Sequence, residues 1–146
     1  MGMLDSQLKL ATAQAATSVG DTSSTNIYDT GSANSSEIGM TGENLWVQAF
    51  VSTAATSGGS ATLQAVLQDS ADGSTFADVL AGPVVALASL TAGAQLLQVQ
   101  PPTGTRRYLR VAWRIGTAAL TAGAFTAYVS NAIQRNVARQ SGFTVQ

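Results

Sequence analysis

Few residues in this chain could carry out chemistry, and their types exclude most catalytic devices. The 146 residues include neither histidine nor cysteine, which removes the commonest general base, the thiol nucleophile and thiolate metal ligands. A hydrolase would then have to use a serine with a lysine base, or a pair of carboxylates. The single lysine, Lys9, lies in a segment that we expect to be an extended arm. We therefore expect no enzymatic activity.

Four aspartates stand mostly in turn-like contexts, where this residue commonly caps the backbone. They are Asp29, Asp69, Asp72 and Asp78. The spacing of Asp69, Asp72 and Gly73 suggests a calcium loop, but the denser acidic pattern and the distal glutamate of such loops are missing. We favour a plain hairpin turn, and we predict no catalytic, cofactor-binding or metal-binding residues. A similar turn at residues 70–76 is common in sandwich domains, including carbohydrate-binding ones, so glycan binding stays open.

The clearest element is a predicted strand at residues 107–115, which positions the arginines. Its odd positions are apolar: Leu109, Val111, Trp113 and Ile115. Strict alternation with more polar even positions predicts a strand with one buried face. Arg106, Arg110 and Arg114 are then expected to share the other face with Tyr108. Such a ladder can track phosphates, but we favour one that faces solvent or another subunit and pairs with acids from the first half of the chain.

The charge of the chain is sparse and segregated. Charged residues make up 10% of the sequence, against about 25% in typical soluble domains. All eight acidic residues lie between Asp5 and Asp78, and six of the seven basic residues are arginines from Arg106 onward. The net charge of −1 argues against nucleic-acid binding. Because interfaces are depleted in lysine, glutamate and aspartate, we expect much of the surface to contact protein; a soluble surface rich in serine, threonine and glutamine is the alternative.

The rest of the chain is predicted to add further strands, separated by turns that contain glycine, proline or serine. These strands lie at residues 26–30, 44–53, 60–68, 76–80, 84–90, 95–100 and 125–133. The strands at 44–53 and 60–68 are expected to form a hairpin. About eight strands without a firm helix indicate an all-β fold, an antiparallel β-sandwich of the jelly-roll type. The predicted organisation is an extended N-terminal arm at 1–26, the jelly-roll domain at 27–133 and a C-terminal tail at 134–146.

Short fragments spread over nearly the whole chain occur together in a specific order and spacing. They are LDxQ at residues 4–7, AQA at 13–15, STNI at 24–27, DxG at 29–31, IG at 38–39, GExL at 42–45, SLTAGA at 89–94, PxG at 102–104, RYLR at 107–110 and TAGA at 121–124. With these fragments the chain resembles the Bbp16-like cement proteins of tailed-bacteriophage capsids. The resemblance implies a jelly-roll subunit that trimerises and sits on the outside of the shell, where major capsid subunits meet. It implies no catalytic residues.

The expected function is therefore that of a structural virion protein. A capsid cement, or decoration protein, would bind the outer capsid surface as a homotrimer, contact the major capsid protein and stabilise the mature capsid. We expect no membrane contact, since no apolar run reaches transmembrane length, and no direct nucleic-acid contact. The expected interface residues are Leu4, Leu8, Trp46, Phe50, Arg106, Tyr108, Arg110 and Arg114. The sandwich is expected to fold without residues 2–20. A carbohydrate- or receptor-binding β-sandwich module and a tail or neck structural protein are the alternatives.

Overall fold

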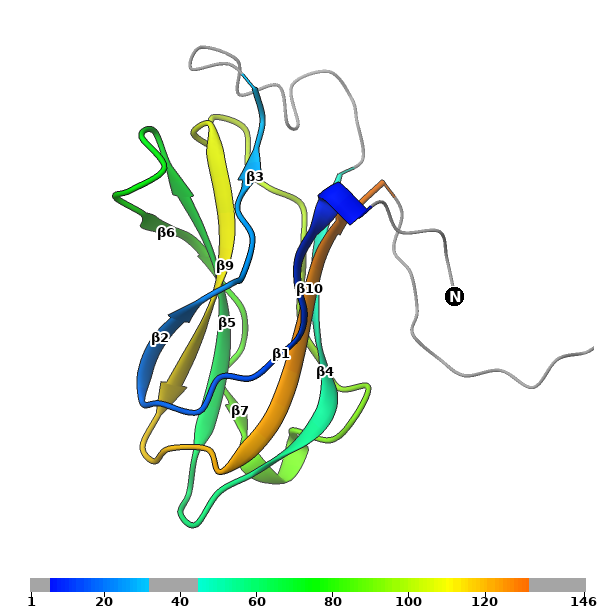
Figure 1. Cartoon of the computed structure of the whole chain (residues 1–146), viewed down its shortest axis with the longest axis vertical. Coiled ribbons are helices and arrows are strands. Elements are labelled where there is room, and N and C mark those ends of the chain that lie inside the picture. Colours follow the sequence, from blue (N-terminus) through cyan, green and yellow to red (C-terminus); the bar gives the residue numbers. More distant parts are fainter. Residues whose placement is uncertain (1–5, 32–44, 132–146) are drawn as a thin grey trace, which may run out of the picture.

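Two antiparallel sheets, packed face to face, form the part of the chain that the computed structural model describes, residues 6–31 and 45–131 (Figure 1). The four-stranded sheet has the order β1-β10-β4-β8. Its strands are β1 (Lys9–Gln14), β10 (Ala122–Ser130), β4 (Trp46–Thr56) and β8 (Gln95–Val99). The six-stranded sheet has the central order β2-β9-β5-β6, while β3 also pairs with β9 and β7 with β5. Its strands are β2 (Gly20–Ser23), β3 (Tyr28–Asp29), β5 (Thr62–Ser70), β6 (Ala77–Ala81), β7 (Val85–Ala86) and β9 (Tyr108–Gly116).

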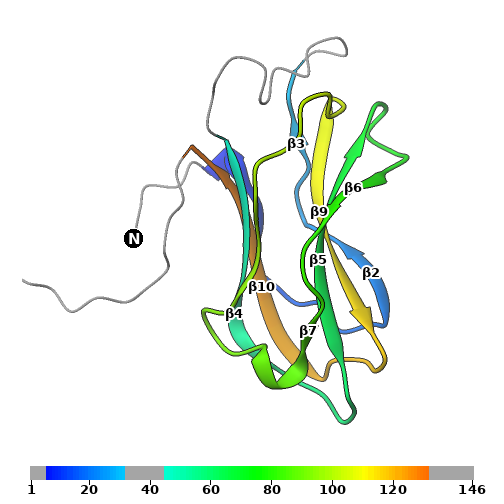
Figure 2. The same ribbon diagram turned by 180° about the vertical axis from the view of Figure 1, so that it is seen from behind.

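The order of pairing is that of a jelly roll. Strand β1 pairs with β10, β2 with β9, β4 with β8 and β5 with β6, so the first half of the chain runs beside the second half in reverse order. The pairs β10–β4 and β9–β5 then roll this long ribbon into two sheets. The two layers are seen from opposite sides in Figure 1 and Figure 2. The predicted all-β antiparallel sandwich is therefore confirmed.

Strand β9 supplies the centre of the core, as the alternation of its sequence predicted. Its four odd-numbered residues, Leu109 to Ile115, are each at most 1% exposed. The ring of Trp113 lies 5.4 Å, between centroids, from that of Phe125 in the opposite sheet. Removing side chains of this size from water stabilises a fold by about 1.5–3 kcal/mol each. The indole nitrogen of Trp113 donates a hydrogen bond to Gln14 Oε1 at 3.1 Å, so the buried ring leaves no polar atom unpaired.

The predicted hairpin between residues 44–53 and 60–68 is wrong. Strands β4 and β5 are consecutive, but they belong to different sheets and stack across the core instead of pairing. The buried residues Val47 and Val51 of β4 and Leu63 and Leu67 of β5 all contribute to the same core. Apolar alternation shows which side of each strand is buried, but two strands that stack face to face have the same alternation as two strands that pair. The pattern alone could not separate these arrangements.

Residues 6–26, which belong to the predicted N-terminal arm, lie along the protein's own sheets. Strands β1 and β2 pair with β10 and β9, and Leu10, Ala11 and Ala16 are at most 2% exposed. Deleting residues 2–20 would remove β1 together with these core side chains. The expectation that the sandwich folds without residues 2–20 therefore does not fit the structure.

The remaining predicted strands correspond to β3, β6, β7, β8 and β10, of which β3, β7 and β8 are shorter than predicted. Residues 84–90, expected to be one strand, form β7 followed by the 3₁₀ turn η2 (Leu87–Ser89), and a second such turn, η1 (Ser6–Leu8), precedes β1. The predicted tail at 134–146 lies outside the described residues. No helix within residues 6–31 and 45–131 is long and apolar enough to cross a membrane.

Candidate interaction surfaces

Two of the predicted interface arginines, Arg110 and Arg114, lie on the outer face of the six-stranded sheet. In the register of β9 against β5, they stand opposite Gln68 and Gln64. Their neighbours along β9 point into the core, so both guanidinium groups point away from it. Both side chains are half-buried, and other polar groups of the sheet surround them.

Arg114 is held between two carboxylates, one from the adjacent strand β2 and one from β6, which lies beyond β5. Its Nε and Nη2 atoms donate to the two carboxylate oxygens of Asp21 in β2 at 2.7 and 2.8 Å, and Nη2 also donates to Asp78 in β6 at 2.9 Å. The two carboxylates raise the pKa of Arg114 above its ordinary value. The pKa of Asp78 is lowered, first by a hydrogen bond from Gln68 and then by Arg114. Pairs this exposed contribute about 0–1 kcal/mol each, but together they join β2, β9 and β6.

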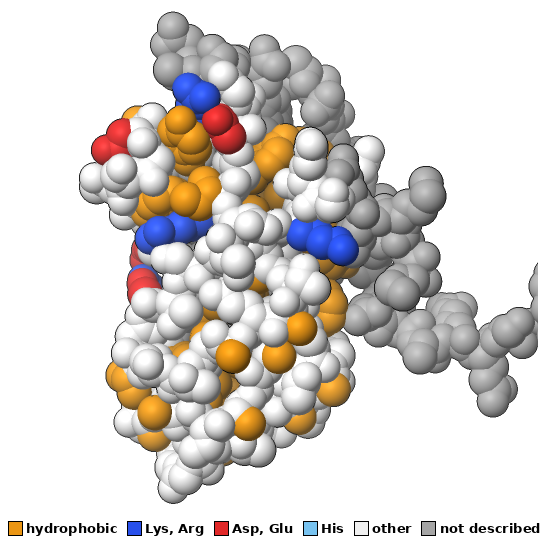
Figure 3. Space-filling view, in the orientation of Figure 1, with side chains coloured by type: hydrophobic (Ala, Val, Ile, Leu, Met, Phe, Trp, Pro, Cys, Tyr) orange, Lys and Arg blue, Asp and Glu red, His pale blue; other side chains and the backbone are white. Residues whose placement is uncertain are grey.

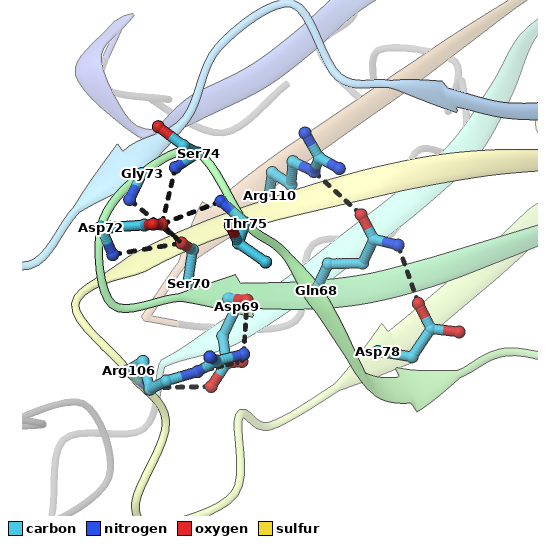
Figure 4. A network of polar contacts seen from close by, with 10 residues as sticks. All are labelled: Gln68, Asp69, Ser70, Asp72, Gly73, Ser74, Thr75, Asp78, Arg106 and Arg110. Atoms are coloured by element: carbon cyan, nitrogen blue, oxygen red, sulfur yellow. Dashed lines mark hydrogen bonds and ion pairs between the residues drawn. The ribbon is translucent and has the colours of Figure 1, made fainter.

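Arg110 makes no ion pair within the described residues. Its Nε donates to Gln68 Oε1 at 2.8 Å, and its guanidinium carbon lies 3.8 Å from the centroid of the Phe76 ring. Gln68 in turn donates to Asp78 at 2.7 Å, as Figure 4 shows. Burial lowers the pKa of Arg110, although an arginine in a protein stays protonated. The side chains from Arg110 through Gln68, Asp78 and Arg114 to Asp21 thus form one continuous polar network across four strands.

Arg106 does not belong to this ladder, so the prediction that it shares a face with Tyr108, Arg110 and Arg114 is wrong. It precedes β9 and binds Asp69, which lies opposite the core residue Leu109. The Arg106 backbone N–H donates to this carboxylate at 2.8 Å, and its Nε and Nη2 donate at 2.9 and 2.6 Å. Figure 4 shows Arg106 on the opposite side of the sheet from Arg110. The alternation of inward and outward side chains in β9 begins at Tyr108, its first paired residue, and therefore does not predict the direction of Arg106.

Arg107, which the sequence did not single out, ties β9 to β3. Its Nε and Nη2 atoms donate to the two carboxylate oxygens of Asp29 at 2.7 and 2.8 Å, and its guanidinium carbon lies 4.9 Å from the centroid of the Tyr108 ring. Hydrogen bonds from Arg107 and from the Gly31 amide lower the pKa of Asp29 to about 2. Opposite charges on neighbouring strands stabilise each other, but the pairing of β3 with β9, which brings Asp29 to Arg107, could not be predicted from the sequence.

The β5–β6 connection is a hairpin turn built on Asp72. The Asp72 carboxylate accepts hydrogen bonds from the backbone amides of Ser74 and Thr75 at 2.9 and 2.8 Å and from the Ser70 hydroxyl at 2.7 Å. These bonds hold the pKa of Asp72 well below its usual range. Gly73 follows with a φ of +75°, a conformation that glycine adopts without strain. The Asp72 carboxylate therefore forms its hydrogen bonds within the turn that it stabilises.

The outer face of the four-stranded sheet has a different chemistry. Its aromatic side chains are Trp46 and Phe50, which are half-buried, and Tyr128, which is 3% exposed. Phe50 and Tyr128 meet edge to face with ring centroids 6.1 Å apart. Gln48, between the two aromatic residues of β4, accepts a hydrogen bond from the Tyr128 hydroxyl at 3.2 Å and donates one to the Ser130 hydroxyl at 3.1 Å. This face is therefore aromatic, amide-rich and uncharged at its centre.

Comparison with known protein families identifies the relatives of this fold. The family model Bbp16 matches residues 10–129. The chain belongs to the Bbp16 family. No curated protein matches the chain. The matched range begins in β1 and ends in β10, so the Bbp16 match spans the complete jelly roll and includes both outer faces.

Membership of this phage family makes the chain a phage structural protein, that is, a virion component. The predicted interface residues fall into separate groups on this Bbp16 fold. Trp46 and Phe50 lie on the outer face of the four-stranded sheet, while Tyr108, Arg110 and Arg114 lie on that of the six-stranded sheet. Leu8 is half-buried in η1 against the core, and Leu4 lies outside the described residues. The predicted residues thus do not form one continuous surface.

Clusters of acidic side chains that could hold a metal ion do not occur within residues 6–31 and 45–131. The acidic residues of the six-stranded sheet are instead spread over β2, β3, β5 and β6, each beside an arginine. Carboxylates that are paired in this way have their lone pairs directed at guanidinium groups. The charged groups of this sheet therefore form ion pairs with one another within the fold.

Proposed function

We propose that this protein is a capsid cement protein, which binds the outside of a tailed-phage shell and stabilises the mature capsid. The observation that carries the proposal is the Bbp16 match, which spans the jelly roll from β1 to β10. The low content of charged residues, 10% of the sequence, supports it, because a surface that binds protein is depleted in lysine and acidic residues. The proposed role is non-catalytic and needs no cofactor.

The proposed mechanism is thermodynamic. A cement that binds the expanded shell, but not its compact precursor or the free subunits, stabilises the expanded state by mass action. We propose that the protein acts as a trimer and contacts several copies of the major capsid protein at once. Simultaneous contacts raise the effective concentration of each binding surface, so modest single contacts yield tight attachment.

Co-sedimentation tests the proposal directly. Purified protein is mixed with expanded shells of its own phage from which it has been removed, and in parallel with compact precursor shells. Saturable binding to expanded shells, with no binding to precursors, is the expected result. Native mass spectrometry of the free protein is expected to give three times the subunit mass, and another multiplicity would correct that part of the proposal. Absence of binding to both kinds of shell would contradict the cement function.

One observation favours carbohydrate binding as a second candidate function. Trp46 and Phe50 are partly exposed aromatic side chains beside amide groups, and flat aromatic surfaces with nearby hydrogen-bonding groups suit sugar rings. A carbohydrate- or receptor-binding module would bind glycans of the host surface, and not shells. Binding to a glycan array together with a negative sedimentation result would favour that function.

A further inference from the structure

We propose that the outer face of the four-stranded sheet is the surface that contacts the capsid shell, and that this contact depends on uncharged groups. The inference rests on the cement function and adds which side of the sandwich faces the shell. It follows from four observations: the distribution of charge between the sheets, the composition of this face, its area, and the place where the described chain begins and ends.

Charge separates the two sheets. Lys9 is the one charged residue in the strands of the four-stranded sheet, whereas the strands of the six-stranded sheet contain six charged residues. These six are Asp21, Asp29, Asp69, Asp78, Arg110 and Arg114. Figure 3 shows charged side chains in the upper part of the visible face, on both its left and its right, and an uncharged surface below them. Because the buried centre of an interface is depleted in charge, the four-stranded sheet is the better candidate for a contact.

The six-stranded sheet is also occupied by its own contacts. The carboxylates of Asp21 and Asp78 both bind Arg114, and Asp29 binds Arg107. A partner that approached this face with charged groups would have to replace these intramolecular bonds, which largely cancels the gain in binding. On the four-stranded sheet no ion pair among the described residues has to be broken.

The groups on the four-stranded sheet suit a partner that folds separately. Trp46 and Phe50 are half-buried but are not among the described side chains that pack against the core, so a partner could cover their remaining exposed area. Gln98, which stands opposite Gln48 in the sheet, adds an amide that can donate and accept hydrogen bonds. Contacts between separately folded proteins combine aromatic and polar groups in this way, while permanent contacts between identical subunits are more apolar. A shell to which the cement is added after assembly is a partner of the first kind.

The area of the face is comparable with that of a small interface. Four strands at the usual spacing cover about 19 Å, and the eleven residues of β4 extend for about 37 Å. The face therefore measures at most about 700 Å², close to the roughly 800 Å² that each partner contributes to a standard interface. The hydrogen bonds that Gln48 makes to Tyr128 and Ser130 fix these side chains in advance, which reduces the entropy lost on binding.

The described chain also begins and ends at this sheet. Ser6 lies just before β1 and Asn131 just after β10, and β1 and β10 pair with each other. Figure 1 and Figure 2 both show the chain entering η1 and leaving β10 at the same end of the four-stranded sheet. The described chain thus begins and ends at strands of the sheet that carries the proposed contact.

The test compares matched variants in the shell co-sedimentation assay, with the full chain throughout. The double variant Trp46→Ala, Phe50→Ala removes the two aromatic side chains, and Arg110→Ala, Phe76→Ala removes a cation and an aromatic ring from the other sheet. A second pair places one lysine on each side: Gln98→Lys in β8 and Thr75→Lys in the turn after β5. Circular dichroism and native mass spectrometry check folding and subunit number, and the lysine pair keeps the test valid if a truncated variant fails to fold.

Loss of shell affinity by about thirty-fold or more is expected for Trp46→Ala, Phe50→Ala, as for interface aromatic residues that dominate binding, and a clear loss for Gln98→Lys. The two changes on the six-stranded sheet are expected to leave affinity within about three-fold, and so is an increase of salt from about 0.05 to 0.5 M. Wild-type affinity in the first double variant, or a changed subunit number, would overturn the inference. Failure of the wild-type protein to bind shells would instead overturn the cement function itself.

Discussion

On the outer face of the six-stranded sheet, Gln68 joins Arg110 to Asp78, whereas on the outer face of the four-stranded sheet Gln48 joins Tyr128 to Ser130. The two glutamines are almost equally buried, with 6% and 5% exposed, and each lies on a central strand of its sheet. Among the described residues, Gln68 connects charged groups and Gln48 connects neutral groups. Both faces thus place a buried glutamine on a central strand, but its described hydrogen-bond partners include charged groups on one face and are neutral on the other.

The jelly roll explains how this difference arises from the order of the sequence. Because the first half of the chain pairs with the second half in reverse order, the acidic strands β2 and β3 come to lie beside the arginine-rich strand β9. Asp21 stands opposite Arg114, and Asp29 stands opposite Tyr108, next to Arg107. Among the described residues, the acidic side chains of β2 and β3 thus pair with arginines of the same subunit. A contact with another protein is not required to neutralise these residues.

The largest expected effect concerns the hydrophobic core between the two sheets. Leu10 of β1 is 1% exposed in the core, so Leu10→Ala should lower the free energy of unfolding by about 3 kcal/mol, through lost burial and the cavity left behind. Leu8→Ala, at a half-buried position in η1, is the matched control and should cost clearly less. Urea denaturation measures both changes. A loss below about 1 kcal/mol for Leu10→Ala would mean that β1 is only loosely attached to the four-stranded sheet.

The next largest effect is the difference in stability lost when Gln68 or Gln48 is removed. Gln68→Ala should lower the free energy of unfolding by about 2 kcal/mol and Gln48→Ala by about 1 kcal/mol, because hydrogen bonds to charged groups contribute more than neutral ones. The side chain lost is the same in both variants, so the difference reports the charge of the partners. High salt should reduce this difference. Equal losses that do not respond to salt would show that the charged network adds nothing to stability.

A smaller effect is expected on acidification, and it should be confined to one sheet. The pKa of Asp29 is lowered to about 2 by Arg107, and that of Asp78 is lowered by Gln68 and Arg114. A carboxylate whose pKa is lower in the folded state stabilises the fold above its unfolded pKa of about 4, and this contribution is lost as the pH falls toward the folded pKa. We expect stability to decline between about pH 4 and pH 2.

Hydrogen exchange and an isosteric variant locate the acid effect. Amide protection should decline first in β2, β3 and β6, because the strands of the four-stranded sheet contain no carboxylate. Asp29→Asn should lower stability at neutral pH and should make the decline between pH 4 and pH 2 shallower. An unchanged acid profile in this variant, or an earlier loss of protection in β4 and β10, would contradict the assignment of the charged contacts to one face.

The sequence predicted the fold more completely than the surface. Strict alternation in β9 identified its buried face correctly, since each apolar side chain enters a core that excludes water. The same alternation could not show that β4 stacks on β5, because pairing partners depend on contacts between residues far apart in the chain. The strand β1 was missed as part of the sandwich, since its buried residues Leu10 and Ala11 are adjacent and therefore show no alternation.

For the interface candidates, sequence reasoning identified the residue types and could not assign their surroundings. Arg106 and Arg110 look alike in the sequence, yet one binds Asp69 at the end of the sandwich and the other lies over Phe76. The difference arises where β9 begins, at Tyr108, and the end of a strand is not fixed by its apolar pattern. The surroundings of Trp46 could not be predicted either, because only the three-dimensional partners of β4 show which of its faces is covered.

The smallest effect lies in the segments that cross between the two sheets. Thr105, between β8 and β9, is 3% exposed, and its hydroxyl has no hydrogen-bond partner among the described residues. A buried hydroxyl without a partner costs free energy that a methyl group of the same size does not, so Thr105→Val should raise the free energy of unfolding by about 0.5–1 kcal/mol. Thr121, in the opposite crossing before β10, shares a hydrogen bond of 2.8 Å with Thr56, and Thr121→Val should slightly destabilise the fold. Thermal unfolding measures both variants, and a loss of stability in Thr105→Val would show that this hydroxyl has a bonding partner in solution.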